Sequence, residues 1–421
     1  MSKTNAAAAP PKFTRYQTFV VGMLAFLQFS VIVDFMILSP LGATLLHDLN
    51  VSTSQFGLVV SAYAFSAGLS GLLTAGFADR FDRKKLLLFF YTGFIVGTFL
   101  CGLAPNYEFL LFARIFTGLF GGVIGSVSFA IIADLFPMSM RGRVMGVVQT
   151  SFAAAQVLGI PLGLVLSNHW GWHMPFFGIA GLGVVVGIFV FLNLRPIDEH
   201  LQHQRNHHPI KHLWTTASKP RHLVGFAATI LLATGGFMLM PFGSAFSVNN
   251  LGISLEKLPL VYVSTGLCSM IAGPYLGRLS DRIGKFPLFV GGTLSCVGMV
   301  LWYTRLDVTP LWVVVAINIL LFITVNARMV SASALTSGVP ELRDRGAFMS
   351  VNSSLQQISG GVAAWIAGQI VVQANPHAPL ENYPMLGIVV ATAMFITLPL
   401  MWNVDRMVKD SPTGAPATQG H

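Results

Sequence analysis

Long apolar stretches separated by short polar segments run along the whole chain. A helix that crosses the hydrocarbon core of a membrane needs about 20 mainly apolar residues. Twelve segments reach this length: 17–45, 55–78, 86–104, 108–136, 143–167, 173–194, 222–248, 257–280, 286–304, 310–338, 346–373 and 383–404. Between Arg143 and Arg195 there is no Lys, Arg, Asp or Glu, so this length requires two crossings, with a turn at SNHWGWHM (167–174). The pattern predicts an all-α polytopic membrane protein with twelve transmembrane helices.

Basic residues support this count because they gather in alternate loops. When both termini are placed inside, every Lys and Arg outside the span interiors lies in an inner segment, except Lys257 and Arg305. Cytoplasmic loops of membrane proteins carry such an excess of Lys and Arg. We therefore expect a multi-pass protein with both termini in the cytoplasm.

The composition agrees with a membrane protein and argues against several other classes. Of the 421 residues, 54% are hydrophobic and 10% are charged, whereas soluble domains carry about 25% charged residues. The net charge of +9 follows the membrane topology and not a soluble basic domain, so we expect no nucleic-acid binding. The three cysteines lie far apart, and the chain carries no nucleotide-binding loop or hydrolase motif. We expect no enzyme activity, no metal and no cofactor.

A long hydrophilic segment, 195–221, divides the chain into 1–194 and 222–421, with six predicted spans in each part. Six of the eleven histidines fall in or next to this segment. Two pairs have the i, i+4 spacing that can bind a metal on a helix: His203 with His207, and His208 with His212. The alternative, which we favour, is a solvated and weakly basic cytoplasmic linker at an anionic membrane surface.

The two parts of the chain resemble each other at an offset of about 203 residues. The loop after span 2 reads GFADRFDRKK (76–85), and the loop after span 8 reads GRLSDRIGK (277–285). The loops after spans 4 and 10 read PMSMRGRVMG (137–146) and PELRDRGAFMS (340–350). Asp79 thus corresponds to Asp281, and Arg141 to Arg345. The repeat predicts two pseudo-symmetric six-helix bundles in parallel orientation, with a substrate site near the midplane between them.

These loops resemble the signature of the major facilitator superfamily, Gly-x-x-x-Asp-Arg-x-Gly-Arg-Lys, which occurs after span 2 and again after span 8. The second copy matches at Gly277, Asp281, Arg282, Gly284 and Lys285. The first copy matches at Asp79, Arg80, Arg83 and Lys84 but has Ala75 and Asp82 where glycines are expected. The resemblance covers the whole chain and implies a transporter that works by alternating access.

Two further motifs resemble those of the twelve-span drug:proton antiporters and the related sugar (arabinose-type) efflux permeases. LLFARIFTG (110–118) is similar to their span-4 motif, and GVVQTSFAAAQVLGIPLG (146–163) is partly similar to their span-5 motif. The resemblance implies a proton-coupled exporter of drug or sugar-like small molecules, a monomer in a bacterial inner membrane. Two alternatives stay open: a proton symporter that imports a sugar or organic acid, and an uncoupled facilitative or lipid carrier.

Asp34, in the apolar stretch VIVDFMILSP (31–40), and Arg114 lie well inside spans 1 and 4. A charge at a helix centre costs at least about 2.5–3.5 kcal/mol on insertion scales, so such residues are usually functional. At the helical rise both lie about 10–15 Å from the outer surface, and the resemblance implies that spans 1 and 4 are neighbours. We expect Asp34 to carry the proton and Arg114 to set its proton affinity. The alternative is a permanent ion pair that only holds two helices together.

The resemblance gives the loop motifs a further role as a conformational latch between the two bundles. In this family the aspartate and arginines of the motif, with an acidic residue at the inner end of span 4, hold the outward-facing state. Asp134 occupies that span-4 position and can pair with Arg83 or Arg141. The expected latch and its second copy comprise Asp79, Arg80, Arg83, Asp134, Arg141, Asp281 and Arg282. For the basic residues of the first loop, simple anchoring at the inner membrane surface is the alternative.

Polar and adaptable side chains inside the spans are candidates for a substrate cavity. Gln149 with Gln156, and Asn352 with Gln356, have spacings that place each pair on one helical face. Arg328 is expected either to bind an anionic group or to extend to the cytoplasmic surface. The full set of candidates is Phe26, Met36, Tyr63, Gln149, Gln156, Asn326, Arg328, Asn352, Gln356 and Trp365. For the polar ones, hydrogen bonding between helices is the alternative.

Overall fold

The computed structural model describes residues 13–74, 77–198, 201, 214–341 and 344–410, and most of them are helical. The first part of the chain forms α1 (Arg15–Ile37), α2 (Gly42–Asp48), α3 (Thr53–Thr74), η1 (Ala78–Arg80), α4 (Arg83–Leu103), α5 (Tyr107–Leu135), α6 (Met138–Ala154), η2 (Ala155–Gly159), α7 (Ile160–Trp170) and α8 (Met174–Asn193). The second part forms α10 (Pro220–Phe237), η4 (Met240–Phe242), α11 (Gly243–Asn249), α12 (Leu258–Ile283), α13 (Lys285–Tyr303), α14 (Leu311–Thr336), α15 (Arg345–Ile370) and α16 (Tyr383–Lys409). The histidine pairs of the 195–221 segment lie outside the described residues.

Polar loop residues fix where several spans begin. The Asp82 carboxylate accepts a hydrogen bond from the Lys85 backbone N–H at 2.9 Å and caps α4. Asn106 caps α5 in the same way through the backbone N–H of Phe109, at 3.0 Å. Such a side chain satisfies one of the four backbone N–H groups that a helix start leaves unpaired. The short polar segments between apolar stretches are therefore helix starts as well as connectors.

The number of spans agrees with the sequence pattern. Eleven helical segments of the described chain are long and apolar enough to cross a membrane. Helix α15 has 26 residues and the position of the eleventh predicted span, 346–373, but its polar side chains keep it out of that group. The twelve-helix prediction therefore fits the fold.

Three of the spans are interrupted, whereas the hydropathy pattern predicts continuous helices. Span 1 breaks between α1 and α2 at Pro40, and span 7 breaks between α10 and α11 at Pro241. Proline lacks an N–H and clashes with the preceding helical turn, so a helix stops or bends there. Span 5 changes to a π-helix in η2, directly before the turn that contains Pro161. Hydropathy alone does not register these breaks because proline and its neighbours are apolar.

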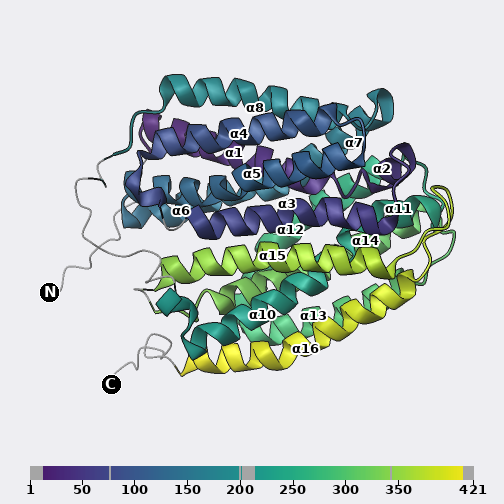
Figure 1. The fold of residues 1–421 in the computed structure, drawn as a ribbon. Coiled ribbons are helices and arrows are strands. Elements are labelled where there is room, and N and C mark those ends of the chain that lie inside the picture. Colours follow the sequence, from purple (N-terminus) through teal and green to yellow (C-terminus); the bar gives the residue numbers. More distant parts are fainter. Residues whose placement is uncertain (1–12, 75–76, 199–200, 202–213, 342–343, 411–421) are drawn as a thin grey trace.

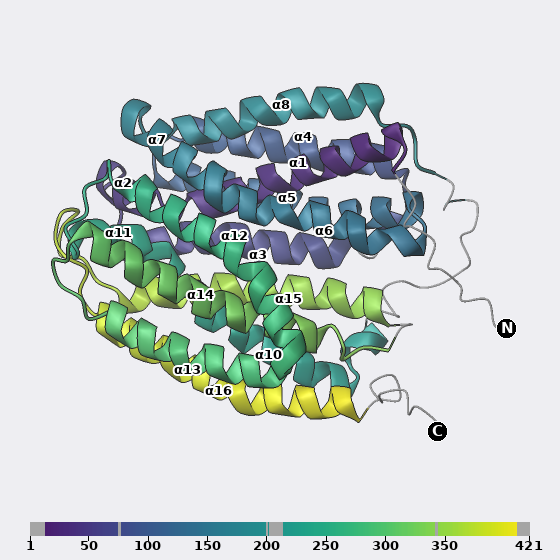
Figure 2. The same cartoon turned by 180° about the vertical axis from the view of Figure 1, so that it is seen from behind.

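The helices lie in two groups that follow the order of the chain (Figure 1, Figure 2). We call them the N-half (α1–α8) and the C-half (α10–α16). Helix α1 begins and α16 ends at the same end of the molecule, here the basal end, while α2 and α11 lie at the opposite, distal end. Helices α3 and α15 run side by side along the boundary between the halves, and α12 contacts η2 and α7 across it.

Candidate functional site

A fully buried ion pair joins α1 and α5 inside the N-half. Arg114 Nη1 donates to Asp34 Oδ2 at 2.9 Å and to the Asp34 backbone carbonyl at 3.3 Å. Asp34 is 0% exposed and Arg114 is 1% exposed. The structure thus brings together the two residues that the sequence places at similar depth in spans 1 and 4.

Two further side chains complete the surroundings of this pair. Thr98 Oγ1, on α4, donates to Asp34 Oδ1 at 3.0 Å, so each carboxylate oxygen accepts a hydrogen bond. The Tyr63 ring, on α3, lies 4.5 Å from the guanidinium carbon of Arg114, which is cation–π range. Tyr63 was expected in a substrate cavity, but in this structure it is buried against the ion pair.

The arrangement has a simple electrostatic consequence. An ionised carboxylate and a guanidinium together carry no net charge, which is how buried ions are tolerated in a low-dielectric interior. A proton on Asp34 would cancel the negative charge and leave Arg114 with a backbone carbonyl and the Tyr63 ring as partners. One proton therefore changes the charge balance of the N-half interior.

Arg328 is a second buried cation, in the C-half. Its side chain is 1% exposed, its Nε donates to Thr293 Oγ1 of α13 at 3.2 Å, and the Phe289 ring lies 5.8 Å away. Its Nη2 has no hydrogen-bond partner, and no carboxylate of the described chain forms an ion pair with it. The buried guanidinium does not extend to the surface of the protein in this conformation.

Replacing Arg328 by glutamine is expected to leave the thermal stability of the purified protein unchanged or to raise it, because the variant no longer buries a charge without a carboxylate partner. The matched control is Arg114→Gln, which strands the carboxylate of Asp34 and should cost about 3–5 kcal/mol. Thermal unfolding in lipid nanodiscs compares the two variants. An equally large loss of stability in Arg328→Gln would show that the guanidinium has an anionic partner in the folded protein.

At the basal end, Asp134 pairs with Arg83 and not with Arg141. Arg83 Nε donates to Asp134 Oδ2 at 3.0 Å. Arg141 instead donates to the backbone carbonyls of Phe136 and Ala133, at 2.9 and 2.6 Å. These contacts lie within the N-half, where they tie the loop after span 2 to the end of span 4.

The remaining latch candidates lie at the basal surface. Asp79 and Arg80 are in η1, where Arg80 is exposed and the side chain of Asp79 lies outside the described part. Asp281 and Arg282 are exposed in the last turn of α12. In this conformation the second copy of the motif therefore faces the surroundings of the protein.

Two of the expected cavity residues bond to neighbouring helices in the C-half. Thr229 Oγ1 of α10 donates to Asn352 Oδ1 at 2.7 Å, and Asn326 Nδ2 of α14 donates to Ser269 Oγ of α12 at 3.2 Å. Hydrogen bonds of this kind hold membrane helices together. In this conformation Asn326 and Asn352 therefore make hydrogen bonds between helices, which is the alternative to a role in a substrate cavity.

The other candidates lie apart from one another and differ in exposure. Gln149 is exposed on α6, and Gln156 lies half-buried in η2 beside α12. Half-buried positions are also found for Phe26, Met36 and Gln356. Trp365 is 45% exposed and lies apart from the recess that Gln357 of the same helix lines. The structure does not gather these residues around one enclosed cavity.

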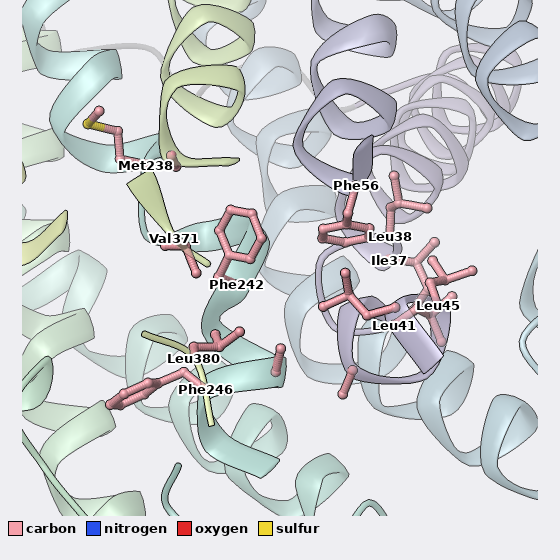
Figure 3. Close-up of a cluster of buried hydrophobic side chains, with 14 of the residues drawn as sticks. Ile37, Leu38, Leu41, Leu45, Phe56, Met238, Phe242, Phe246, Val371 and Leu380 are labelled. Carbon is pink, nitrogen blue, oxygen red and sulfur yellow. The ribbon is translucent and has the colours of Figure 1, made fainter. Parts of the chain in front are cut away.

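Apolar side chains from both halves close the distal end (Figure 3). Those labelled in Figure 3 are Ile37, Leu38, Leu41, Leu45 and Phe56 of the N-half, and Met238, Phe242, Phe246, Val371 and Leu380 of the C-half. The Phe242 ring points across the boundary and meets the Phe56 ring edge-on, with centroids 5.9 Å apart. We call this set the distal plug. A recess of about 10 Å³ next to it, lined in part by Phe35, has room for about one water molecule.

Polar contacts add to the closure where the two proline breaks meet. Ser39 Oγ donates to the backbone carbonyl of Met240, and Ser244 Oγ donates to the Ser39 carbonyl at 2.8 Å. Ser39 precedes Pro40 as Met240 precedes Pro241, so corresponding positions of the repeat contact each other across the two halves.

Toward the basal end α12 separates from span 5, while α3 and α15 stay in contact across the boundary. A Cβ placed at Gly266 of α12 would lie 3.1 Å from the backbone of Gln156 across the boundary. Further along α12, a Cβ at Gly273 or Gly277 meets no atom within 4 Å. Helix α12 also contacts η2 and α7 more extensively than α6, the basal part of span 5. The boundary is thus closed at the distal end and open between α6 and α12 at the basal end.

Two helix groups that close together at one end and separate along one side at the other have the architecture of an alternating-access membrane transporter. The sequence agrees with this class, because a model of the Major Facilitator Superfamily matches residues 24–364 and, in a second alignment, 225–417. The chain belongs to the Major Facilitator Superfamily, and so to a family of secondary transporters and not of enzymes.

Similar proteins and structures agree with this assignment. The uncharacterized MFS-type transporter YceJ of Bacillus subtilis is 29% identical over 62% of this chain and 66% of its own length, just under two thirds. The uncharacterized MFS-type transporter YbcL of the same organism is 24% identical over 89% of this chain and 94% of its own length. The inward-facing, occupied crystal structure of a bacterial homologue of the human lysosomal transporter Spinster has a TM-score of 0.76, at 16% identity, over 95% of this chain and 100% of that one. The nucleoside transporter NupG has a TM-score of 0.72, at 14% identity, over 92% of this chain and 99% of that one.

Proposed function

We propose that this chain is a proton-coupled exporter of drug-like or sugar-like small molecules that binds its proton at Asp34. The buried pair of Asp34 and Arg114 carries the proposal, because an ionisable carboxylate is costly inside a membrane protein unless it has a function. A conformational change that opens the pair to water on one side would let it take up or release a proton. Each proton moving inward supplies about 2.3 kcal/mol per 100 mV, which can drive the substrate outward.

We propose further that the basal end faces the cytoplasm of a bacterium and that the protein acts as a monomer in the inner membrane. The excess of Lys and Arg in the loops of this end supports the orientation. The closed distal plug and the separation of α6 from α12 then correspond to an inward-facing state. The similarity to the inward-facing Spinster homologue supports the same assignment.

In this proposal the conformational latch forms in the outward-facing state, in which the basal end is closed. When the basal end closes, the loop with Asp79, Arg80 and Arg83 would approach the start of α15. The N-terminal backbone N–H groups of a helix attract a carboxylate there. The pairing of Arg83 with Asp134 keeps this loop attached to the N-half so that both move together.

Everted membrane vesicles that contain the overproduced protein test the direction and the coupling. We expect at least one compound from a panel of cationic dyes and pentoses to accumulate inside on energisation, and a protonophore to release it. A symporter would instead accumulate its substrate in right-side-out vesicles. An uncoupled carrier would equilibrate it regardless of the protonophore. Either of these results would contradict the proposed export.

A further inference from the structure

The Tyr63 ring connects the buried ion pair to the boundary between the halves. Besides its cation–π contact with Arg114, it meets the Phe35 ring at a centroid distance of 5.4 Å. Phe35 in turn meets the Phe237 ring of the C-half at 6.0 Å. Tyr63 is 1% exposed, so packed atoms surround it on all sides. Three rings thus form a continuous path from Arg114 to the other half.

The far end of this path belongs to the distal closure. Phe35 and Phe237 both line the small recess next to the distal plug. Phe237 also packs on Gly360 of α15, where a Cβ would lie 3.2 Å from the ring. Because protein interiors are close-packed, a shift of one ring must displace the next. A movement that starts at Tyr63 therefore ends where the halves close.

We propose that Tyr63 is a positioning residue that transmits the charge state of Asp34, through Phe35, to Phe237, and thereby biases the distal closure. This inference rests on the proposed proton role of Asp34. While Asp34 is ionised, Arg114 is shared between the carboxylate and the ring. When Asp34 binds a proton, the guanidinium keeps the Asp34 backbone carbonyl and the Tyr63 ring as partners and shifts toward the ring. The ring then presses on Phe35, the contact with Phe237 weakens, and the distal end opens.

Few groups near the ion pair can change their charge between about pH 5 and pH 8, so a response of the distal closure in this range can be traced to Asp34. The other titratable groups packed around Asp34 are Arg114 of α5, Tyr63 of α3 and Cys101 of α4. Arginine is always protonated in proteins, and the phenol and the thiol titrate near about pH 10 and 8.5 in water. His47 of α2 and His377 also contact each other across the halves, with ring centroids 4.6 Å apart. The labels described next replace both histidines.

The test measures the distal opening directly and needs no substrate. Spin labels are attached to His47→Cys and His377→Cys in a Cys268→Ser background, in nanodiscs of phosphatidylethanolamine and phosphatidylglycerol. Electron paramagnetic resonance then gives the ratio of open to closed distal ends. Between pH 8 and pH 5 we expect this ratio to rise about tenfold, and Asp34→Asn to hold it at the acid value at every pH. Tyr63→Leu should reduce the change to less than about twofold.

Tyr63→Phe is the matched control, because it keeps the ring and should keep the full response. Infrared spectra of the carboxyl band should show that Asp34 still binds its proton in Tyr63→Leu. Phe237→Leu changes the other end of the path and should reduce the response in the same way. This variant tests the proposal if Tyr63→Leu does not fold.

Two negative outcomes can be told apart. If Asp34→Asn removes the response but Tyr63→Leu and Phe237→Leu retain all of it, the path through Tyr63 is refuted and the proton role stands. If the labelled protein shows no response that depends on Asp34, the proposed proton role fails, and the path fails with it.

Discussion

Asp34→Asn is expected to abolish proton-driven accumulation of substrate while leaving a folded protein. Asparagine is nearly isosteric: its amide oxygen can accept from Arg114 and its NH2 group can donate to the Thr98 hydroxyl, but it cannot exchange a proton in the working range. We expect accumulation in energised everted vesicles to fall by about a hundredfold or more. Exchange of labelled for unlabelled substrate, which needs no net proton movement, should continue.

A matched control and a double variant separate this role from a purely structural ion pair. Asp48→Asn makes the same change at an exposed carboxylate, whose one ion pair in the described part of the chain is with its neighbour His47, and should leave coupling intact. Asp34→Asn with Arg114→Gln removes both buried charges, which is often neutral for stability. We expect this double variant to regain thermal stability without regaining coupling. Normal coupling in Asp34→Asn would show that the pair only holds α1 and α5 together.

The sequence predicts the pairing of Asp34 with Arg114 from two signals in the residues, together with the family resemblance, which implies that spans 1 and 4 are neighbours. Each charge stands alone in an apolar span, and the span count places both at similar depth. Depth follows from counting residues along a helix, so it can be read without a structure. The same reasoning predicts the twelve spans and the division between the halves.

The sequence does not show how each helix is rotated about its own axis, and this rotation decides which side chains face one another. Thr98 is one polar residue in an apolar span, and nothing in the sequence shows that α4 turns it toward Asp34. Tyr63 was assigned to a substrate cavity for its aromatic character, yet α3 turns it onto Arg114. Such contacts depend on how neighbouring helices pack, which combines many weak side-chain preferences.

The helix breaks at Pro40 and Pro241 are also missing from the sequence-based prediction, but the internal repeat does carry a signal for them. The two prolines occupy matching positions of the two halves, and both stand inside segments that hydropathy treats as continuous spans. Proline at the same place in both copies indicates a break in both. Aligning the copies residue by residue would have predicted the short helices α2 and α11 at the distal end.

Gly57→Leu is expected to open the distal end. A Cβ at Gly57 of α3 would lie 2.9 Å from the Ala364 carbonyl and 3.1 Å from Gly368 Cα, both in the backbone of α15. Helix backbone cannot turn aside as a side chain can, so a leucine must push the two helices apart. Overpacking of this kind costs about 1–3 kcal/mol, and here only the closed state bears it. The ratio of open to closed distal ends should therefore rise about fivefold to a hundredfold.

The spin labels at positions 47 and 377 measure this ratio, and Gly22→Leu is the control. Gly22 of α1 is exposed and a Cβ there meets no atom within 4 Å, so the same substitution should leave the ratio unchanged. An opened distal end should also slow transport, because the carrier must close there to present its site to the basal side. If Gly57→Leu keeps the ratio of the parent protein, the close approach of α3 and α15 at Gly57 does not contribute to the distal closure. The plug around Phe56 and Phe242 would then hold the distal end closed by itself.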